Sequence, residues 1–251
     1  LNSAGTFSDA VDFNAISGTL NSVEIDDSTA LALQAMKLTG NLTVSAGGNV
    51  TNTGTLDIGG STKVTVSSNS YLANLNTTTN DFKGAVSIHG AGIVNLTDIN
   101  AIEIGQMEST RMILTAGGAV TQTSSGALAI TQAHGLTIKA WDGSSVYYDI
   151  TLNNQSNDLS LLAVTYGANV AITDTNAIIL GASTVTGTYA VTARGAVTDN
   201  GALAITGAAT IIAQSSNGAT DYAITLDNTS HNFGTIGVKG AAVELVDAGA
   251  I

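Results

Sequence analysis

Four aspartates occupy the same place in a short phrase that recurs along the chain. They are Asp27, Asp98, Asp174 and Asp247, in the phrases DDSTALAL, TDINAIEIG, TDTNAIILG and VDAGAI. Asn100 and Asn176 follow two residues after their aspartates in two of the copies. Because Ca²⁺ is bound by six to eight carboxylate and carbonyl oxygens, the recurring phrase is a candidate calcium-binding column.

The same residue types are also typical of turns, which gives the aspartates a second interpretation. Asp and Asn side chains accept hydrogen bonds from nearby backbone and tolerate tight turns. If the copies lie about four rungs apart in a stack of strands, they are separated by about 19 Å and cannot share one ion. The Gly-rich nonapeptide of calcium-binding rolls is missing from the chain. We therefore favour a turn role for the four aspartates and predict no cofactor.

Acids and imidazoles that could cleave a glycan are scattered over the chain. The acids are Asp26, Asp27, Asp149, Asp221 and Asp227, and the imidazoles are His89, His134 and His231. A glycan-cleaving site needs two carboxylates close together. Such a site should also be a single departure from a repeating background, and no acid beside Arg or Lys breaks the repeat in that way. The sequence predicts that the chain is not an enzyme, with a glycan-cleaving enzyme as the weakest alternative.

An aromatic segment is the clearest departure from the repetitive background. Trp141, Tyr147 and Tyr148 stand together in the segment WDGSSVYYD. Trp and Tyr combine an apolar ring with a polar tip, and exposed rings of this kind stack on sugars. The same residues would also serve to fill a wide turn or to cover a corner. Both interpretations stay open, and the first makes this segment a candidate carbohydrate-binding patch.

The composition points to an all-β protein. The chain has 251 residues, of which 44% are hydrophobic, 10% charged and 4% aromatic, with 28 Gly, no Pro and no Cys. Its many Thr, Val and Ile residues favour strands. Pro cannot donate to a strand ladder, so its absence suits a fold in which almost every N–H is paired. Without Cys, disulfides and thiolate chemistry are excluded.

The charge excludes another class of function. The formal net charge is −12, with only seven basic residues, and these are scattered. A nucleic-acid-binding surface needs clustered Lys and Arg, so we expect no nucleic-acid partner. No apolar run approaches the length of roughly 18 residues that crosses a bilayer, so we expect no insertion into a membrane. The chain starts and stops within its own repeat pattern, which suggests one continuous segment, residues 1–251, of a longer protein.

Several phrases recur together and define a long repeat. SAGGNVT at 45–51 returns as TAGGAVT at 115–121 and as TARGAVT at 192–198. The phrases VDF, NDF, NDL and HNF recur with a similar spacing. The period is roughly 70–77 residues, longer than one structural repeat of a solenoid. The long repeats cover about 12–79, 80–156, 157–230 and, in part, 231–251.

A finer pattern inside the long repeat predicts the architecture. Apolar–x–apolar triplets alternate with Gly, Asn, Asp, Ser or Thr clusters, which is typical of short strands joined by tight turns. Each long repeat divides into about four units of roughly 16–22 residues, the length of one coil of a parallel β-helix. A string of immunoglobulin-like sandwiches would have a similar long period, but it requires more large aromatic residues in its core.

The sequence thus predicts a parallel β-helix of about 13 rungs, roughly 60 Å long. One large apolar residue should enter the core in each long repeat. These core residues are Phe13, Phe82, Leu159 and Phe233, which share one position of the repeat.

The phrases themselves resemble a known class of repeats. TAGGAVTQTSSGALAIT, NDFKGAVSIHGAGIVNLTDINAIEIG and ITLDNTSHNFGTIGV are similar to repeats of very large bacterial exoproteins of the filamentous haemagglutinin type. The resemblance covers essentially the whole chain and rests on the residue pattern of the repeats. It implies a right-handed β-helical rod outside the cell or on its surface, serving adhesion, aggregation or filament assembly. The family's N-terminal secretion domain has no counterpart in these residues.

Together these observations predict a structural or adhesive rod that associates with itself end to end or laterally. Host or neighbour-cell glycans are further expected partners, through the candidate patch at Trp141. An ice-binding surface is a weaker alternative, because the Thr row in TVTGTYAVT is not continued in the previous repeat.

Overall fold

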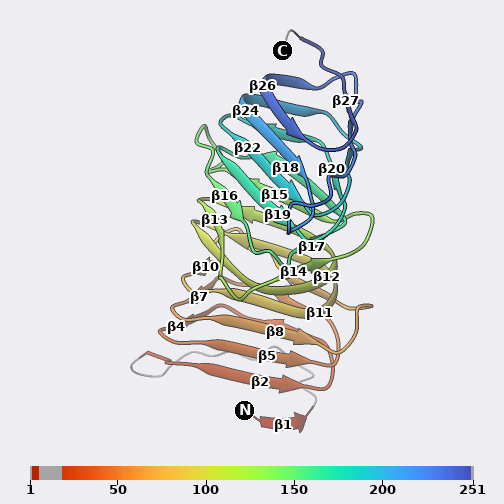
Figure 1. Cartoon of the computed structure of the whole chain (residues 1–251). Helices are drawn as coiled ribbons and strands as arrows, with labels where there is room; N and C mark the ends of the chain where they lie inside the picture. Colours follow the sequence, from red (N-terminus) through yellow and green to blue (C-terminus); the bar gives the residue numbers. More distant parts are fainter. Residues whose placement is uncertain (1, 6–18, 250–251) are drawn as a thin grey trace.

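The chain folds into a stack of parallel coils. A computed structural model describes residues 2–5 and 19–249. In Figure 1 the coils follow the sequence, from β1 at one end of the stack to β27 at the other. The described residues contain strands and turns but no helix, and so no helix that could cross a membrane. The predicted all-β solenoid is confirmed.

Most coils contribute three strands, one to each side of the stack. The first strands are β1 (Asn2–Gly5), β2 (Val23–Asp27), β3 (Leu31–Leu33), β4 (Met36–Leu38), β5 (Leu42–Ala46), β6 (Val50–Asn52), β7 (Leu56–Ile58), β8 (Thr62–Val66), β9 (Leu72–Leu75) and β10 (Asp81–Phe82). The middle strands are β11 (Val86–Asp98), β12 (Ile102–Ala116), β13 (Val120–Gln122), β14 (Leu128–Ile130), β15 (Leu136–Ala140), β16 (Ile150–Leu152), β17 (Asp158–Leu159), β18 (Leu161–Tyr166) and β19 (Val170–Asp174). The last strands are β20 (Ile178–Leu180), β21 (Ser183–Val185), β22 (Tyr189–Ala193), β23 (Val197–Asp199), β24 (Leu203–Ala213), β25 (Ile224–Leu226), β26 (Asn232–Lys239) and β27 (Val243–Leu245).

Every pairing between these strands is parallel and joins one coil to the next. Strand β2 lies in register on β5, β5 on β8, and β8 on the start of β11. Strands β4, β7 and β10 form a separate three-stranded sheet in the first coils. Antiparallel contacts in the described chain are limited to two isolated bridges, Trp141 with Tyr147 and Gln214 with Asp221. The sandwich alternative is therefore wrong, because antiparallel strands would dominate it.

Alternation along each short strand builds the core. In β2 the first, third and fifth residues are buried and the residues between them are exposed. Successive side chains of a strand point to opposite faces, so an apolar–x–apolar triplet sends its Val, Ile or Leu inward. The buried residues of all coils join into one continuous apolar core that runs along the stack.

Three of the four predicted core residues are confirmed. Phe82, Leu159 and Phe233 are 1%, 0% and 2% exposed. Each follows the same turn of its long repeat, on β10, β17 and β26. The fourth, Phe13, lies outside the described residues.

The recurring glycine phrase also has a steric cause. A Cβ on Gly118 would lie 2.6 Å from the backbone nitrogen of Ala101 in the coil below, and one on Gly195 would lie 2.5 Å from that of Ala177. The preceding position tolerates a side chain, since Arg194 stands there in the last copy. The backbone of the previous coil also packs closely on Gly117, where a Cβ would lie 2.1 Å from Ile99 O, but only the second glycine of the phrase is present in all three copies.

The solenoid has about 11 turns, close to the predicted 13. The difference arises because the coils are unequal in length. The coil that runs from the start of β14 at Leu128 to the start of β17 at Asp158 is longer than most, because part of it forms the hairpin closed by Trp141 and Tyr147. Dividing the chain into equal units of about 19 residues therefore overcounts the turns.

The core position of Phe82 allows a test with a substitution taken from the next repeat. We expect Phe82→Ala to lower the free energy of unfolding by about 3–5 kcal/mol, because it leaves a cavity between coils. Phe82→Leu should cost about 1 kcal/mol, since Leu159 fills the equivalent place. Urea unfolding followed by circular dichroism measures both. Equal losses of unfolding free energy for the two variants would show that stability does not depend on the side-chain volume at this position.

Candidate functional site

The recurring aspartates lie at turns and hold the backbone of two coils. Asp98 Oδ2 accepts a hydrogen bond from the backbone N–H of Phe82 at 2.7 Å, one coil below, and Oδ1 accepts from Asn100 at 2.8 Å. Asp174 binds Leu159 at 2.7 Å and Asn176 at 3.0 Å in the same way. Each carboxylate thus joins a local turn to the core strand beneath it.

The first and last copies follow the pattern as far as they are described. Asp247 accepts from the N–H groups of Phe233 and Gly249, both within 3.0 Å. Asp27 makes the contact within its own turn, where it accepts hydrogen bonds from the backbone N–H and the hydroxyl of Thr29. The turn role expected for these residues therefore accounts for their contacts. Within residues 2–5 and 19–249, no three His, Asp or Glu side chains are grouped so that they could hold a metal ion.

Burial makes two of these carboxyls weaker acids than usual. Asp98 and Asp174 are almost fully buried, and desolvation raises the pKa of each to about 6. The hydrogen bonds from backbone N–H groups oppose this shift, because they stabilise the charged form. The nearby carboxylates of Asp81 and Asp158 add to the rise. These two turns are therefore the parts of the described core that respond to mild acid.

A second polar column lies inside the coils, and we did not predict it from the sequence. Asn80 Oδ1 accepts from the N–H of Leu56 at 3.0 Å and from the side-chain amide of Asn52 at 2.9 Å. Its own amide donates to Leu75 O at 3.1 Å. Both donors and the acceptor lie in earlier coils or turns, so one buried amide satisfies backbone that the strand ladder leaves unpaired.

Equivalent buried polar residues follow in the later long repeats, but the type of side chain differs. Asn157 accepts from the N–H of Leu128 at 3.0 Å and from the side chain of Gln122 at 2.6 Å. His231 is the third member, and its Nδ1 accepts from the N–H of Leu203 at 3.0 Å. The recurrence of NDF, NDL and HNF was the available signal, because the polar residue always precedes the core residue by two positions.

The histidine member has a fixed tautomer and a buried acidic neighbour. Because Nδ1 accepts a hydrogen bond, the ring proton sits on Nε2. Nε2 lies 3.5 Å from Asp199 Oδ1, and both side chains are at most 2% exposed. The same Asp199 oxygen accepts from the N–H of Asp227 at 3.0 Å. At this distance Nε2 makes no hydrogen bond in the described chain, so the third copy of the column is held through Nδ1, whereas the first two copies use amides.

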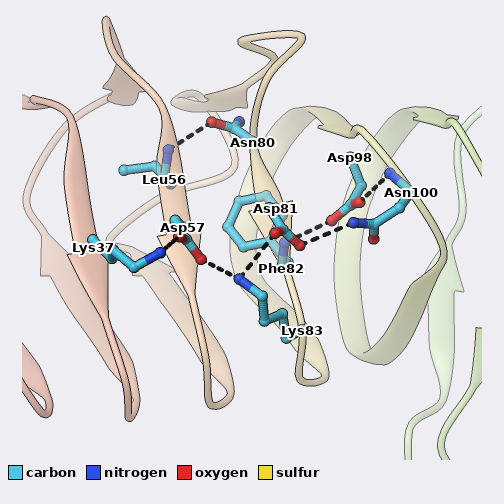
Figure 2. A network of polar contacts seen from close by, with 9 residues as sticks. All are labelled: Lys37, Leu56, Asp57, Asn80, Asp81, Phe82, Lys83, Asp98 and Asn100. Atoms are coloured by element: carbon cyan, nitrogen blue, oxygen red, sulfur yellow. Dashed lines mark hydrogen bonds and ion pairs between the residues drawn. The ribbon is translucent and has the colours of Figure 1, made fainter.

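A chain of ion pairs runs along the outside of the first coils, as Figure 2 shows. Lys37 and Lys83 both bind the carboxylate of Asp57, and Lys83 Nζ also lies 2.9 Å from Asp81 Oδ2. The hydrogen bond from Lys37 is the main cause that lowers the pKa of Asp57. The hydrogen bond to Asp57 is the main cause that raises the pKa of Lys83. Asn100 then donates to Asp81 Oδ1 at 3.0 Å and links this surface to the turn at Asp98.

The structure only partly assembles the predicted aromatic patch. The ring centroids of Trp141 and Tyr147 lie 5.3 and 5.6 Å from that of Tyr166, a residue not predicted to belong to the patch. Lys139 Nζ lies 4.3 Å from the centroid of the Trp141 ring, a cation–π contact. Tyr148 instead packs against the apolar core. The half-buried cluster is therefore formed by Trp141, Tyr147 and Tyr166, in the hairpin after β15 and at the end of β18.

The remaining acids and histidines lie at separate places along the stack. Asp149 accepts from the backbone and side-chain amides of Asn169 at 3.0 and 2.9 Å, and Asp221 accepts from Gln214 at 2.7 Å. Asp26 and His134 are exposed. His89 is half-buried, and burial is the main cause that lowers its pKa. Asp149 thus joins its turn to the next coil, and Asp221 joins the two sides of a hairpin.

Stacked parallel coils, linked by repeated polar side chains, define a β-solenoid repeat protein. The chain belongs to the family described as repeats of unknown function (DUF5649), which matches residues 20–89, 91–165 and 167–238. The starts of the three matched segments are spaced in agreement with the long period found in the sequence. The boundaries of these segments do not coincide with those of the repeats counted from Asn80 and Asn157, because the starting point of a repeat in an array is arbitrary. No curated protein and no solved structure matches the chain.

The raised pKa values of Asp98 and Asp174 predict a pH-dependent stability. The pKa of each is about 6 in the folded chain and 3.8 for an unperturbed aspartate, so each favours folding most below pH 4. That contribution, about 3 kcal/mol for each carboxyl, is lost as the pH rises through 6. Urea midpoints measured between pH 4 and pH 7 should therefore fall with rising pH.

Replacing both carboxyls provides the control for this prediction. In Asp98→Asn/Asp174→Asn no proton is released at these turns, so most of the slope between pH 4 and pH 6 should disappear. The carboxyls of Asp57 and Asp142, whose pKa values are lowered, act in the opposite direction and only below that range. An unchanged slope in the double variant would show that other groups cause it.

Proposed function

We propose that the chain is a shaft segment of a bacterial surface or extracellular filamentous protein, with a structural and adhesive role. The observation that carries this proposal is the use of the repeated polar residues. Asp98, Asp174, Asn80 and Asn157 use their hydrogen bonds to join one coil to the next. Both the apolar core and the polar columns connect each coil to the next. Such a repeat suits a stiff rod, because each coil is fixed by the coils beside it.

The last described coil supports a role in association. Val238 on β26 and Val243 on β27 are 38% and 45% exposed, although their partners in the preceding coil, Ile211 and Ile224, are buried. Strand edges and apolar side chains at the end of a stack pair readily with further strands. We infer that a further coil stacked on β26 and β27 covers these side chains, and that a second copy of the chain can supply such a coil by end-to-end association.

The proposed location rests on the resemblance to filamentous haemagglutinin-type repeats and on composition. A net charge of −12 and only seven basic residues suit a well-solvated, displayed surface that does not bind nucleic acid. Adhesion, aggregation and filament assembly are the roles that this resemblance brings to the chain.

Electron microscopy of the purified chain tests the rod. About 11 turns at a strand spacing of about 4.8 Å predict particles roughly 50 Å long, which join into longer rods. Neither the length nor the association should change when EDTA removes divalent cations. Compact globules without an axial repeat would contradict the proposal.

A matched pair of substitutions separates end-to-end joining from nonspecific contact. Val243→Lys places a charge on the last strand and should shift sedimentation-velocity profiles toward single rods. Val146→Lys alters a valine with the same 45% exposure in a hairpin on the side of the stack, and association should persist. Equal loss of association in both variants would argue for general charge repulsion.

A carbohydrate-binding patch is the second candidate function, and one specific observation favours it. The cluster of Trp141, Tyr147 and Tyr166 is half-buried and lies where a hairpin interrupts the repeat. Partly exposed aromatic rings suit the apolar face of a sugar.

Glycan-array binding distinguishes this patch from simple packing. Trp141→Ala should lower binding by about tenfold or more, because the stacking face is lost. Trp141→Phe keeps a ring and should retain most of the signal, and circular dichroism of both variants reports whether the fold is intact. A wild-type signal no higher than that of Trp141→Ala would reject this second candidate.

A further inference from the structure

The second and third long repeats carry the same surface carboxylate, but only the second pairs it with a lysine. Asp81 and Asp158 occupy equivalent positions, directly before Phe82 and Leu159 in the phrases NDFK and NDLS. Asn100 donates to Asp81 Oδ1 at 3.0 Å, and Asn176 donates to Asp158 Oδ1 at 2.9 Å. One oxygen of each carboxylate is therefore held by the same contact in both repeats.

The second oxygen is where the two copies diverge. In the repeat that begins at Asn80, Lys83 Nζ lies 2.9 Å from Asp81 Oδ2, as Figure 2 shows. In the repeat that begins at Asn157, Ser160 replaces this lysine, and no residue of the described chain donates a hydrogen bond to Asp158 Oδ2. Asp158 thus keeps the anchoring amide but lacks the ammonium group that its counterpart binds.

A groove opens beside this carboxylate. It has a volume of about 400 Å³ and extends over the two following coils. Its lining includes Asp158, Ser160, Asn176, Ala177, Ile179 and Ala196. The carboxylate and the hydroxyl of Ser160 come from β17 and the residue directly after it, and the coils above contribute alkyl side chains together with Asn176 and Thr198. An extended alkyl chain with a positive end matches this distribution.

We propose that this groove binds the primary ammonium group of a lysine side chain presented by a protein partner. The ammonium would donate to Asp158 Oδ2 and to Ser160 Oγ, as Lys83 donates to Asp81 within the chain. Its methylene groups would cover Ala177 and Ile179, because lysine buries its stem along apolar surface while its head stays polar. The site assigns a partner chemistry that does not depend on whether the solenoid acts as a rod.

Ligand-observed saturation-transfer NMR tests the site and tolerates assembled protein. The probe is Nα-acetyl-lysine methylamide, and the control ligand Nα-acetyl-norleucine methylamide has an apolar alkyl side chain without the charge. Saturable transfer to the lysine methylenes is expected, with a Kd on the order of millimolar for one partly exposed ion pair, weakening with added salt. Equal transfer to the norleucine compound would overturn the proposal.

Three variants make the test specific. Asp158→Asn removes the charge, and Ser160→Lys supplies the missing lysine from within the chain, so both should abolish saturable binding. Ser70→Lys adds the same charge at an exposed position outside the groove and should retain binding. Binding that survives Ser160→Lys would refute the site.

Putrescine separates the two sources of an alkylammonium group. If it binds and the lysine compound does not, the ligand is a free polyamine and the proposal of a protein lysine fails. If the lysine compound binds, and only with Asp158 and Ser160 intact, a protein partner is supported.

Discussion

The pairing of backbone groups between consecutive coils is the constraint on which the rest of this molecule depends. Each coil must place its N–H and C=O groups opposite those of the next coil, and a buried group without a partner is costly. Straight segments meet the requirement by parallel strand pairing. At corners the chain changes direction and the ladder is interrupted. There the side chains of Asp98, Asn80 and their counterparts take the place of the missing backbone partner.

This constraint explains why some of the structure was predictable from the sequence. Apolar triplets and turn residues recur because each coil solves the same local problem, so the solenoid followed from periodicity alone. The local hydrogen bond from Asn100 to Asp98 also followed, since it spans two residues. The second bond, from Phe82 to Asp98, joins residues 16 positions apart. It depends on the register between coils, which no local pattern specifies.

The differences from the prediction have the same origin. The observed number of turns is close to the predicted 13, and it is lower because the hairpins closed by Trp141 with Tyr147 and by Gln214 with Asp221 lengthen their coils without adding others. Tyr166 was missed as a neighbour of Trp141 because it lies in the following coil, with several strands of sequence between them. Tyr148, although adjacent to Tyr147, turns toward the core, as alternation along an extended chain requires. Proximity in sequence is therefore a poor guide wherever contacts cross between coils.

The two polar environments of the coil are under different constraints. Inside, Asn80, Asn157 and His231 differ in chemistry, yet each accepts a hydrogen bond from the N–H group of the leucine below it. A change there must preserve an acceptor at that point, because the group it satisfies is buried. Outside, the replacement of Lys83 by Ser160 breaks no rung and leaves both Asp–Asn contacts in place. Differences on the outer face thus cost little stability, and binding properties can vary there from one repeat to the next while the core stays the same.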